Sequence, residues 1–282
     1  MELSCDFVRS ILPFRDPDGH KGTFGKVLLL CGSVGYTGAA YYAASAAVTG
    51  GSGLVFLGVP WGIWHILAQK CTSAMPFPLW GACHLRSGAE PAIRRRMKSC
   101  DAALLGCGLG RETSTVRLIR RLLDTELPLV LDADALYAVA DRMELLAARR
   151  SRVTVLTPHE GEFARLGGTL SAGRLAAAQE FARIHQVYLV LKGPRTVIAA
   201  PDGRCAVNTT GNCGMAKGGS GDLLAGLITS LLGQGMAPFD ACCAAVWCHG
   251  RAGDLAAERC GKRAMTPDHT LACLPAAFLE TE

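Results

Sequence analysis

The sequence predicts an α/β protein in three layers, with a central, mostly parallel β-sheet between two layers of helices. Three observations predict this class. Short apolar runs alternate with helical segments along most of the chain, a pattern that favours parallel strands joined by crossover helices. Several of these runs end in a glycine-rich or polar cluster, as strands do at the ligand-binding edge of an open parallel sheet. Half of the residues are hydrophobic, only 6% are aromatic and 33 are glycine, which suits close packing of helices on a sheet.

The first third of the chain contains two clear strand patterns, at Lys26 to Gly32 and at Leu54 to Val59. Both are short apolar runs without polar alternation, which is typical of strands buried on both faces. Between them, Gly38 to Thr49 consists mainly of small residues and is expected to form a helix. The segment from residue 61 to residue 98 is ambiguous, because prolines interrupt any long element.

Strand and helix patterns become regular again after residue 100. Further strands are expected at Asp101 to Leu105, Leu129 to Leu131, Val153 to Leu156 and Val187 to Leu191. Helices are expected from about Thr113 to Asp124 and from Leu175 to His185. Because strands and helices alternate, we expect right-handed crossovers and parallel pairing of the strands.

The last third of the chain departs from this alternation. Thr196 to Ala200 and Arg204 to Val207 flank Pro201-Asp202-Gly203, a turn sequence that predicts an antiparallel hairpin added late to the sheet. Two mostly apolar helices follow, from Leu223 to Leu232 and from about Asp240 to Ala257. No break in composition marks a linker, so residues 1–282 are expected to form a single domain.

Charge and cysteine content argue against several classes of protein. The net charge of +5 is small. A solvated helix face explains its densest basic run, Arg94 to Lys98, so we expect no nucleic-acid partner. The 13 cysteines are scattered and form no Cys-x-x-Cys pair, which favours reduced thiols and a cytoplasmic location. The start of the chain lacks the apolar core of a signal peptide, and no apolar stretch is long enough to predict a membrane span.

The prediction of function centres on Asn208 to Asp222, a glycine-rich loop that ends where a helix begins. Backbone N–H groups at a helix start lack helical partners, and glycines let a phosphate approach them closely. We therefore expect an anion-binding site here. Asp222 places a carboxylate beside that site, which favours a base next to a bound phosphate. The alternative is an acidic residue that only stabilises the first turn of the helix.

Other polar clusters follow the predicted strands, so we expect them at the same edge of the sheet. Asp132 and Asp134 either hold a cation or water at a cleft, or form a local turn hydrogen bond. His159 and Glu162 either face the cleft or belong to a solvated, capped helix start. Lys192 either contacts a phosphate or only caps the end of a strand.

Together these motifs resemble the ribokinase-like superfamily and, more closely, its ADP- or ATP-dependent NAD(P)H-hydrate dehydratases. The resemblance covers the chain from about His20 to about Ala257. It rests on His20-Lys21-Gly22, Gly32-Ser33 with Gly38-Ala39-Ala40, Gly108-Leu109-Gly110, Leu131 to Leu136, Thr157-Pro158-His159 with Glu162, Lys192-Gly193 with Thr196, and Asn212 to Asp222. His159 favours the dehydratases, because many kinases of the superfamily carry asparagine there. Lys217 departs from the small residue expected before Gly218.

The resemblance implies a ribokinase-like fold and a lyase that repairs nicotinamide nucleotides. Its substrates would be the S-epimer of hydrated NADH or NADPH and, as co-substrate, ADP or ATP. The nucleotide would phosphorylate the ring hydroxyl, and loss of phosphate would restore the reduced cofactor. A separate epimerase would cooperate with it. The resemblance further implies a homo-oligomer, a tetramer in this family.

The resemblance also implies roles for individual residues. Asp222 matches the general base of the superfamily. The hydrated cofactor would meet Ala40, Gly108, His159 and Asp222. The nucleotide would be bound by Lys192, Gly193, Pro194, Arg195, Thr196, Gly218, Gly219, Ser220 and Gly221. Glu162 matches the glutamate that orders magnesium-bound water, and Mg²⁺ would bridge phosphate oxygens.

Two other functions fit parts of the same pattern. A ribokinase-like kinase for a thiazole or pyrimidine alcohol would share the loop and the base, but it would release a stable phosphate ester. A non-catalytic nucleotide sensor would share the loop, but it would gain nothing from a carboxylate at Asp222. The choices between ADP and ATP, and between NADH and NADPH hydrates, stay open at this point.

Overall fold

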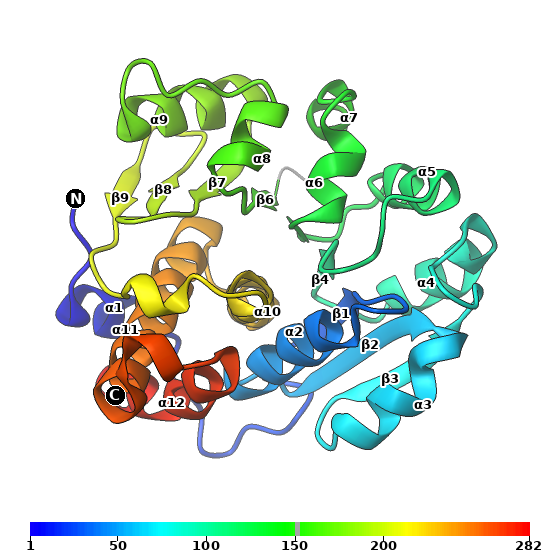
Figure 1. The fold of residues 1–282 in the computed structure, drawn as a ribbon, viewed down its shortest axis with the longest axis horizontal. Helices are drawn as coiled ribbons and strands as arrows, with labels where there is room; N and C mark the ends of the chain where they lie inside the picture. Colours follow the sequence, from blue (N-terminus) through cyan, green and yellow to red (C-terminus); the bar gives the residue numbers. More distant parts are fainter. Residues whose placement is uncertain (150–152) are drawn as a thin grey trace.

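The computed structural model describes residues 1–149 and 153–282. Its centre is a sheet of nine described strands in the order β3-β2-β1-β4-β5-β6-β7-β8-β9 (Figure 1). The strands are β1 (Lys26–Leu30), β2 (Leu54–Pro60), β3 (Met75–Leu79), β4 (Ala102–Leu105), β5 (Leu129–Leu131), β6 (Thr154–Leu156), β7 (Tyr188–Leu191), β8 (Val197–Ala199) and β9 (Cys205–Val207). Neighbours from β3 to β7 are parallel, whereas β7–β8 and β8–β9 are antiparallel. This confirms both the parallel sheet and the late hairpin.

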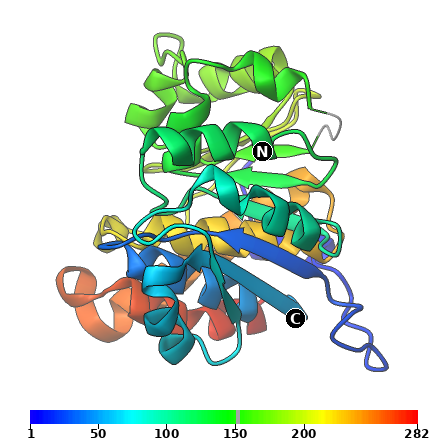
Figure 2. The same ribbon diagram turned by 90° about the vertical axis from the view of Figure 1, so that its right-hand side faces the viewer.

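Helices cover both faces of the sheet, as the two perpendicular views show (Figures 1 and 2). One hydrophobic core lies beneath α1 (Cys5–Ile11), α2 (Thr37–Thr49), α3 (Trp61–Lys70), α10 (Ser220–Gly233), α11 (Pro238–Ala264) and α12 (Pro267–Leu279). The other lies beneath α4 (Glu90–Met97), α5 (Thr113–Leu122), α6 (Asp134–Val139), α7 (Glu144–Ala147), α8 (Glu160–Arg165) and α9 (Arg174–His185). The predicted three-layer sandwich is therefore confirmed.

The uninterrupted apolar strands are explained by these two cores. In β1, Val27 and Leu29 belong to the core beneath α2 and α10, whereas Leu28 and Leu30 belong to the core beneath α4 and α5. Successive side chains of a strand point to opposite faces, so a strand covered on both sides must be apolar at every position. All four of these residues are at most 1% exposed.

The segment that was ambiguous from the sequence contains α3, β3 and α4. Its prolines occupy positions that tolerate them. Pro76 and Pro78 lie in β3, which is an edge strand and therefore has one side without ladder hydrogen bonds. Pro91 lies in the first turn of α4, where a backbone N–H has no helical partner to lose. The prolines are therefore compatible with β3 and α4 and do not interrupt either element.

The two outer strands of the sheet, β3 and β9, both have a limited capacity to pair with a further strand. Strand β3 carries Pro76 and Pro78, which cannot donate a backbone hydrogen bond. Strand β9 is bordered by the start of the chain, because the N–H of Leu3 donates to the carbonyl of Val207 at 3.0 Å. The N–H of Val207 in turn donates to the carbonyl of Met1 at 2.9 Å.

The helix that begins near Asp222 is packed unusually closely against the small-residue helix α2. A Cβ atom added to Gly226 of α10 would lie 2.1 Å from the carbonyl oxygen of Ala43 in α2. Five alanines of α2 are fully buried in this contact and its surroundings. The small residues of α2 thus serve packing within the chain. Among the described helices, none is both long enough and apolar enough to cross a membrane.

We predict that Gly226→Ala destabilises the protein by about 2 kcal/mol or more, because the added methyl group meets backbone that cannot move freely. Chemical denaturation gives the free energy of unfolding. The matched control is Gly38→Ala in α2, whose added Cβ would lie 3.9 Å from its nearest neighbour, the Tyr42 ring. We expect the control to change stability by less than about 1 kcal/mol. Equal effects of the two substitutions would contradict the close approach of α2 and α10.

Candidate active site

The polar clusters predicted after the strands meet at one edge of the sheet. Cys107 follows β4, Asp132 follows β5, His159 follows β6 and Lys192 follows β7. The segments that follow β6 and β7 are joined by a backbone hydrogen bond, in which the N–H of Lys192 donates to the carbonyl of Pro158 at 2.8 Å. This is the carboxyl edge of the parallel strands, where open α/β sheets bind ligands.

The start of α10 reaches the same edge. Its N-cap residue is Gly219, which has a φ of +104° and no side chain with which to cap the helix. The N–H of Ser220 donates to the carbonyl of Lys217 at 3.3 Å, whereas the N–H groups of Gly221 and Asp222 have no helical partner and are left to solvent or to a ligand. A Cβ atom on Gly221 would lie 3.3 Å from the Nζ atom of Lys192. The predicted anion-binding helix start and the predicted phosphate-binding lysine are thus brought together.

Lys192 is paired with buried carboxylates. Its Nζ atom donates to the Oδ1 atom of Asp132 at 2.7 Å and lies 3.9 Å from the Oε2 atom of Glu162. The Thr157 hydroxyl donates to the same Asp132 oxygen at 2.6 Å. Burial alone would lower the pKa of Lys192, but Asp132 and Glu162 outweigh it and raise that pKa. The lysine is therefore a fixed positive charge at this edge.

Asp132 and Asp134 have separate hydrogen-bonding partners within the protein. Asp132 pairs with Lys192, whereas Asp134 accepts the backbone N–H of Gly110 at 2.8 Å and pairs with Arg111 at 3.0 Å. The sequence indicated neither the pair of Asp132 with Lys192 nor that of Asp134 with Arg111, and a cation or water held by these aspartates stays a prediction. The sequence could not distinguish the two arrangements, because Lys192 is 60 residues away from Asp132.

His159 and Glu162 form a reciprocal helix cap. The Nδ1 atom of His159 accepts the N–H of Glu162 at 3.2 Å, and a carboxylate oxygen of Glu162 accepts the N–H of His159 at 2.9 Å. The His159 side chain remains 60% exposed, whereas that of Glu162 is 9% exposed. The capped helix start that the sequence allowed is therefore present, and Glu162 also faces Lys192.

Asp222 lies within this cluster at the first turn of α10. Atoms of Asp222, Asp132 and Cys107 that could bind a cation all lie within 4.8 Å of one another. Burial, followed by the negative charge of Asp132, raises the pKa of Asp222 to about 6, although Lys192 and Cys107 oppose the shift. A carboxylate with such a pKa accepts a proton readily near neutral pH, as a general base must.

The other residues predicted to contact the nucleotide or the hydrated cofactor differ in exposure and in their position around this cluster. Gly193, Pro194 and Arg195 are exposed immediately after Lys192, in a turn where the Thr196 hydroxyl donates to the Gly193 carbonyl at 3.1 Å. Gly218 is also exposed. Two predicted contacts with the hydrated cofactor lie on the β1–β4 side. There Ala40 is fully buried, and a Cβ on Gly108 would lie 2.9 Å from the Cβ of Tyr36.

Sequence reasoning missed two residues of the cluster. The Sγ atom of Cys107 lies 3.5 Å from the Oδ2 atom of Asp132, and its pKa is raised by a hydrogen bond to Cys31 and by burial. The Nε2 atom of the buried His249 lies 3.4 Å from the Ser220 hydroxyl. The available signal was a histidine inside the apolar run of α11, a position where a polar side chain needs a partner.

Lys217 has a structural role. Its ammonium group donates to the backbone carbonyl of Arg263 at 2.8 Å and also to that of Met265. These carbonyls lie at the end of α11, where a positive charge is favourable. The unexpected lysine thus ties the glycine-rich loop to that helix end.

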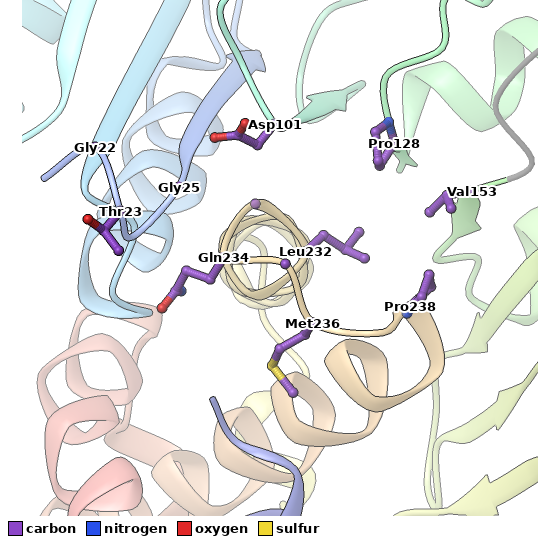
Figure 3. Close-up of a pocket in the computed structure, with 12 residues that line it drawn as sticks. Gly22, Thr23, Gly25, Asp101, Pro128, Val153, Leu232, Gln234, Met236 and Pro238 are labelled. Atoms are coloured by element: carbon purple, nitrogen blue, oxygen red, sulfur yellow. The ribbon is translucent and has the colours of Figure 1, made fainter. Parts of the chain in front are cut away.

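A cavity lies away from this site. This cavity of about 490 Å³ is lined by residues that include Thr23, Asp101, Pro128, Gln234 and Met236 (Figure 3). Asp101 and Pro128 precede strands β4 and β5, so the cavity is at the amino edge of the sheet, next to the end of α10. The part of α10 from Asp222 to Gly233, which lines the cavity, spans about 17 Å at 1.5 Å per residue.

The fold and this site define a ribokinase-like protein. A ribokinase-like superfamily protein from Enterococcus faecalis V583 has the same fold, with a TM-score of 0.86 and 26% sequence identity, covering 99% of this chain and 95% of its own. A family model described as NAD(P)H-hydrate dehydratase matches residues 27–276. The chain belongs to the NAD(P)H-hydrate dehydratase family.

Two named relatives are closer in sequence. The ADP/ATP-dependent NAD(P)H-hydrate dehydratase of Bacillus subtilis, co-crystallised with ATP/Mg²⁺, has a TM-score of 0.85 and 32% identity, covering 99% of this chain and 98% of its own. The bifunctional NAD(P)H-hydrate repair enzyme of Moorella thermoacetica is 45% identical over 280 residues, or 97% of this chain and 53% of the relative. The chain thus spans about half the length of the curated relatives it matches first.

We predict that Asp222→Asn makes the protein more stable than the wild type at pH 7 to 8. The wild-type carboxyl group has a pKa near 6 when folded, above its usual 3.8. The folded state therefore binds more protons between these values, and wild-type stability falls as pH rises through this interval. The variant lacks this loss and should gain about 3 kcal/mol above pH 6.

Denaturant unfolding of both proteins at pH 4, 5, 6 and 7.5 measures this difference. The gain should shrink as pH falls and be small near pH 4, which is well below the folded pKa and close to the usual value of 3.8. A difference in stability that does not depend on pH would contradict a raised pKa at Asp222.

Proposed function

We propose that this protein dehydrates the S-epimer of hydrated NADH or NADPH at the expense of ADP or ATP. The single observation that carries this proposal is Asp222, a carboxylate with a pKa of about 6 at a helix start whose N–H groups can receive an anion. Membership of the dehydratase family supports the choice of substrate. The catalytic parts would all lie within residues 1–282, which we propose act as one domain.

The chemistry follows from the leaving group. Hydroxide leaves a carbon atom poorly, whereas phosphate leaves well. Asp222 would accept the proton of the ring hydroxyl while its oxygen attacks the terminal phosphorus of the nucleotide, releasing AMP from ADP, or ADP from ATP. The C–O bond of the phosphate ester then breaks with the help of the lone pair on the ring nitrogen. Loss of a proton from the neighbouring carbon restores the dihydropyridine and leaves inorganic phosphate.

The surrounding residues would hold the reactants. Main-chain N–H groups of Gly218, Gly219, Ser220 and Gly221 would receive the phosphates, and Lys192 would supply a fixed positive charge. Lys192, Gly193, Pro194, Arg195 and Thr196 would line the nucleotide site, and the hydrated cofactor would meet Ala40, Gly108, His159 and Asp222. Phosphoryl transfer depends mainly on such alignment and charge neutralisation.

Magnesium fits the donors available at this site. The carboxylate of Glu162 is a hard oxygen ligand beside Lys192, and Mg²⁺ commonly binds proteins through few carboxylates and several waters. Glu162 would hold the ion through water. When bound, Mg²⁺ would neutralise charge on the phosphate oxygens.

The two alternative functions, a small-alcohol kinase and a nucleotide sensor, explain fewer of these observations. A kinase for a small alcohol would use the same base, but the family and the named relatives favour the dehydratase. A nucleotide sensor does not account for a carboxylate beside the anion site. We also propose a cytoplasmic enzyme that works with a separate epimerase and assembles as a homo-oligomer, a tetramer, with no nucleic-acid or membrane partner.

We predict that the purified protein restores the absorbance of reduced nicotinamide when it is given hydrated NADH, Mg²⁺ and ADP or ATP. Asp222→Asn should bind nucleotide within about threefold of the wild type but lose at least a hundredfold in kcat, because the base is gone. The matched control is Asp240→Asn, which removes another first-turn aspartate at the start of α11.

The control should keep wild-type turnover. A stable phosphate ester and no recovery of absorbance would favour the kinase. Equal turnover of Asp222→Asn and the wild type would reject Asp222 as the base.

We further predict that kcat/KM falls about tenfold per pH unit below pH 6 and is level just above it. Asp222 must be deprotonated to act as a base, and its pKa in the free enzyme is about 6. Initial rates at low substrate concentration between pH 4.5 and 8 measure this profile. A level profile down to pH 4.5 would show that another group limits the reaction.

A further inference from the structure

Helix α11 lies against the glycine-rich loop that precedes Asp222. The loop contains the short helix η2 (Cys213–Met215) and continues to the N-terminus of α10. In Figure 1 the yellow loop runs beside the orange α11 before it enters α10. No residue of α11 appears among the predicted contacts with substrate or nucleotide.

One carboxylate of α11 holds two groups of the loop. The Oδ2 atom of Asp254 accepts the backbone N–H of Gly211 at 2.8 Å. Its Oδ1 atom accepts the side-chain amide N–H of Asn212 at 2.9 Å. Asn212 in turn caps η2, because its Oδ1 atom accepts the N–H of Gly214 at 3.0 Å. Asp254 thus fixes the residues where the loop turns toward α10.

The same helix face packs directly against the loop. The carbonyl of Trp247, about two turns before Asp254, accepts the hydroxyl of Thr210 at 3.0 Å. A Cβ atom on Gly250 would lie 2.2 Å from the Thr210 hydroxyl oxygen. A Cβ atom on Gly253 would lie 2.2 Å from the Met215 sulfur. These glycines allow the loop backbone and side chains to rest directly on the helix.

His249, on the same helix, supports the end of the loop. Its Nε2 atom lies 3.4 Å from the Ser220 hydroxyl, in the first turn of α10. Burial and the nearby charge of Lys192 lower the pKa of His249 to about 4. Its ring is therefore neutral near pH 7 and acts as a hydrogen-bonding group, not as a cation that binds phosphate.

We propose that Asp254 is a positioning residue for nucleotide binding, which holds the Gly211–Asn212 turn so that the first N–H groups of α10 stay open to the nucleotide phosphates. Asp254 acts through the loop and does not touch the reacting atoms. This inference rests on the proposed function for the identity of the ligand. The order of the loop itself can be measured without any ligand.

The test is Asp254→Asn, which keeps the shape of the side chain but turns one acceptor oxygen into a donor. That donor then faces either the Gly211 N–H or the Asn212 amide, so one of the two hydrogen bonds is lost. We expect calorimetric Kd values for ADP and ATP to rise about tenfold, with kcat at saturating nucleotide changing less than about threefold. Hydrogen exchange at residues 211–214 should become faster in the protein without nucleotide.

A reciprocal exchange provides the rescue. Asn212→Asp combined with Asp254→Asn places a donor on α11 opposite an acceptor on the loop, which restores the pairing in reverse. The double variant should recover part of the nucleotide affinity that the single variants lose, because the Asn212 bond to the Gly253 carbonyl is not restored, and the coupling should be measurable as a double-mutant cycle. Additive losses would show that Asp254 and Asn212 act independently of each other.

Glu258→Gln is the matched control. Glu258 is a second carboxylate of α11, is 65% exposed and pairs with Arg251 at 3.5 Å, away from the loop. This variant should leave both nucleotide affinity and loop exchange unchanged. Wild-type affinity and wild-type loop exchange in Asp254→Asn would overturn the inference, as would strictly additive losses in the double variant.

If the wild type binds no nucleotide, the proposed function fails, whereas hydrogen exchange still decides whether Asp254 holds the loop. Faster exchange at residues 211–214 in Asp254→Asn would then support the positioning role alone. Unchanged exchange would overturn that role as well.

Discussion

The candidate site depends on one ammonium group among three carboxylates. Lys192 pairs with Asp132 and lies near Glu162, while the start of α10 adds Asp222 to the same cluster. Grouping like charges away from water is costly unless each is paired or protonated. Lys192 is already engaged with Asp132, and it offsets only part of what burial and Asp132 do to Asp222. The capacity of Asp222 to take up a proton near neutral pH therefore originates first in its burial and then in the charge of Asp132, which Lys192 offsets only in part.

This charge cluster exists because two parts of the chain meet at one sheet edge. The ends of β4, β5, β6 and β7 supply Cys107, Asp132, the His159–Glu162 cap and Lys192. The start of α10 supplies the open N–H groups and Asp222. Its tight packing on α2, made possible by Gly226, fixes how far α10 reaches over the edge. Helix packing on one face of the sheet and the chemistry at its edge are thus coupled through a single rigid element.

Much of this architecture could be predicted from local sequence. Uninterrupted apolar strands, the late hairpin and the glycine-rich start of α10 are all encoded within short windows, and the structure confirms each. Pairings between distant residues could not be predicted in this way. Nothing near Asp132 in the sequence indicates Lys192, 60 residues later. Similarly, Asp254 lies 43 residues after Gly211 in an otherwise ordinary helix. Such contacts depend on strand order and helix placement, which only the folded chain defines.

The edge strands β3 and β9 have a limited capacity to pair with a further strand, and this limits how copies of this chain can associate. One border is β3, whose prolines remove hydrogen-bond donors, and the other is β9, whose Val207 is engaged by the first residues of the chain. Exposed borders are the usual template for intermolecular strand pairing and fibril growth. Here neither border offers a full ladder to an incoming strand. Contacts between subunits would therefore have to use helices and loops, which leaves the sheet's register unaffected by assembly.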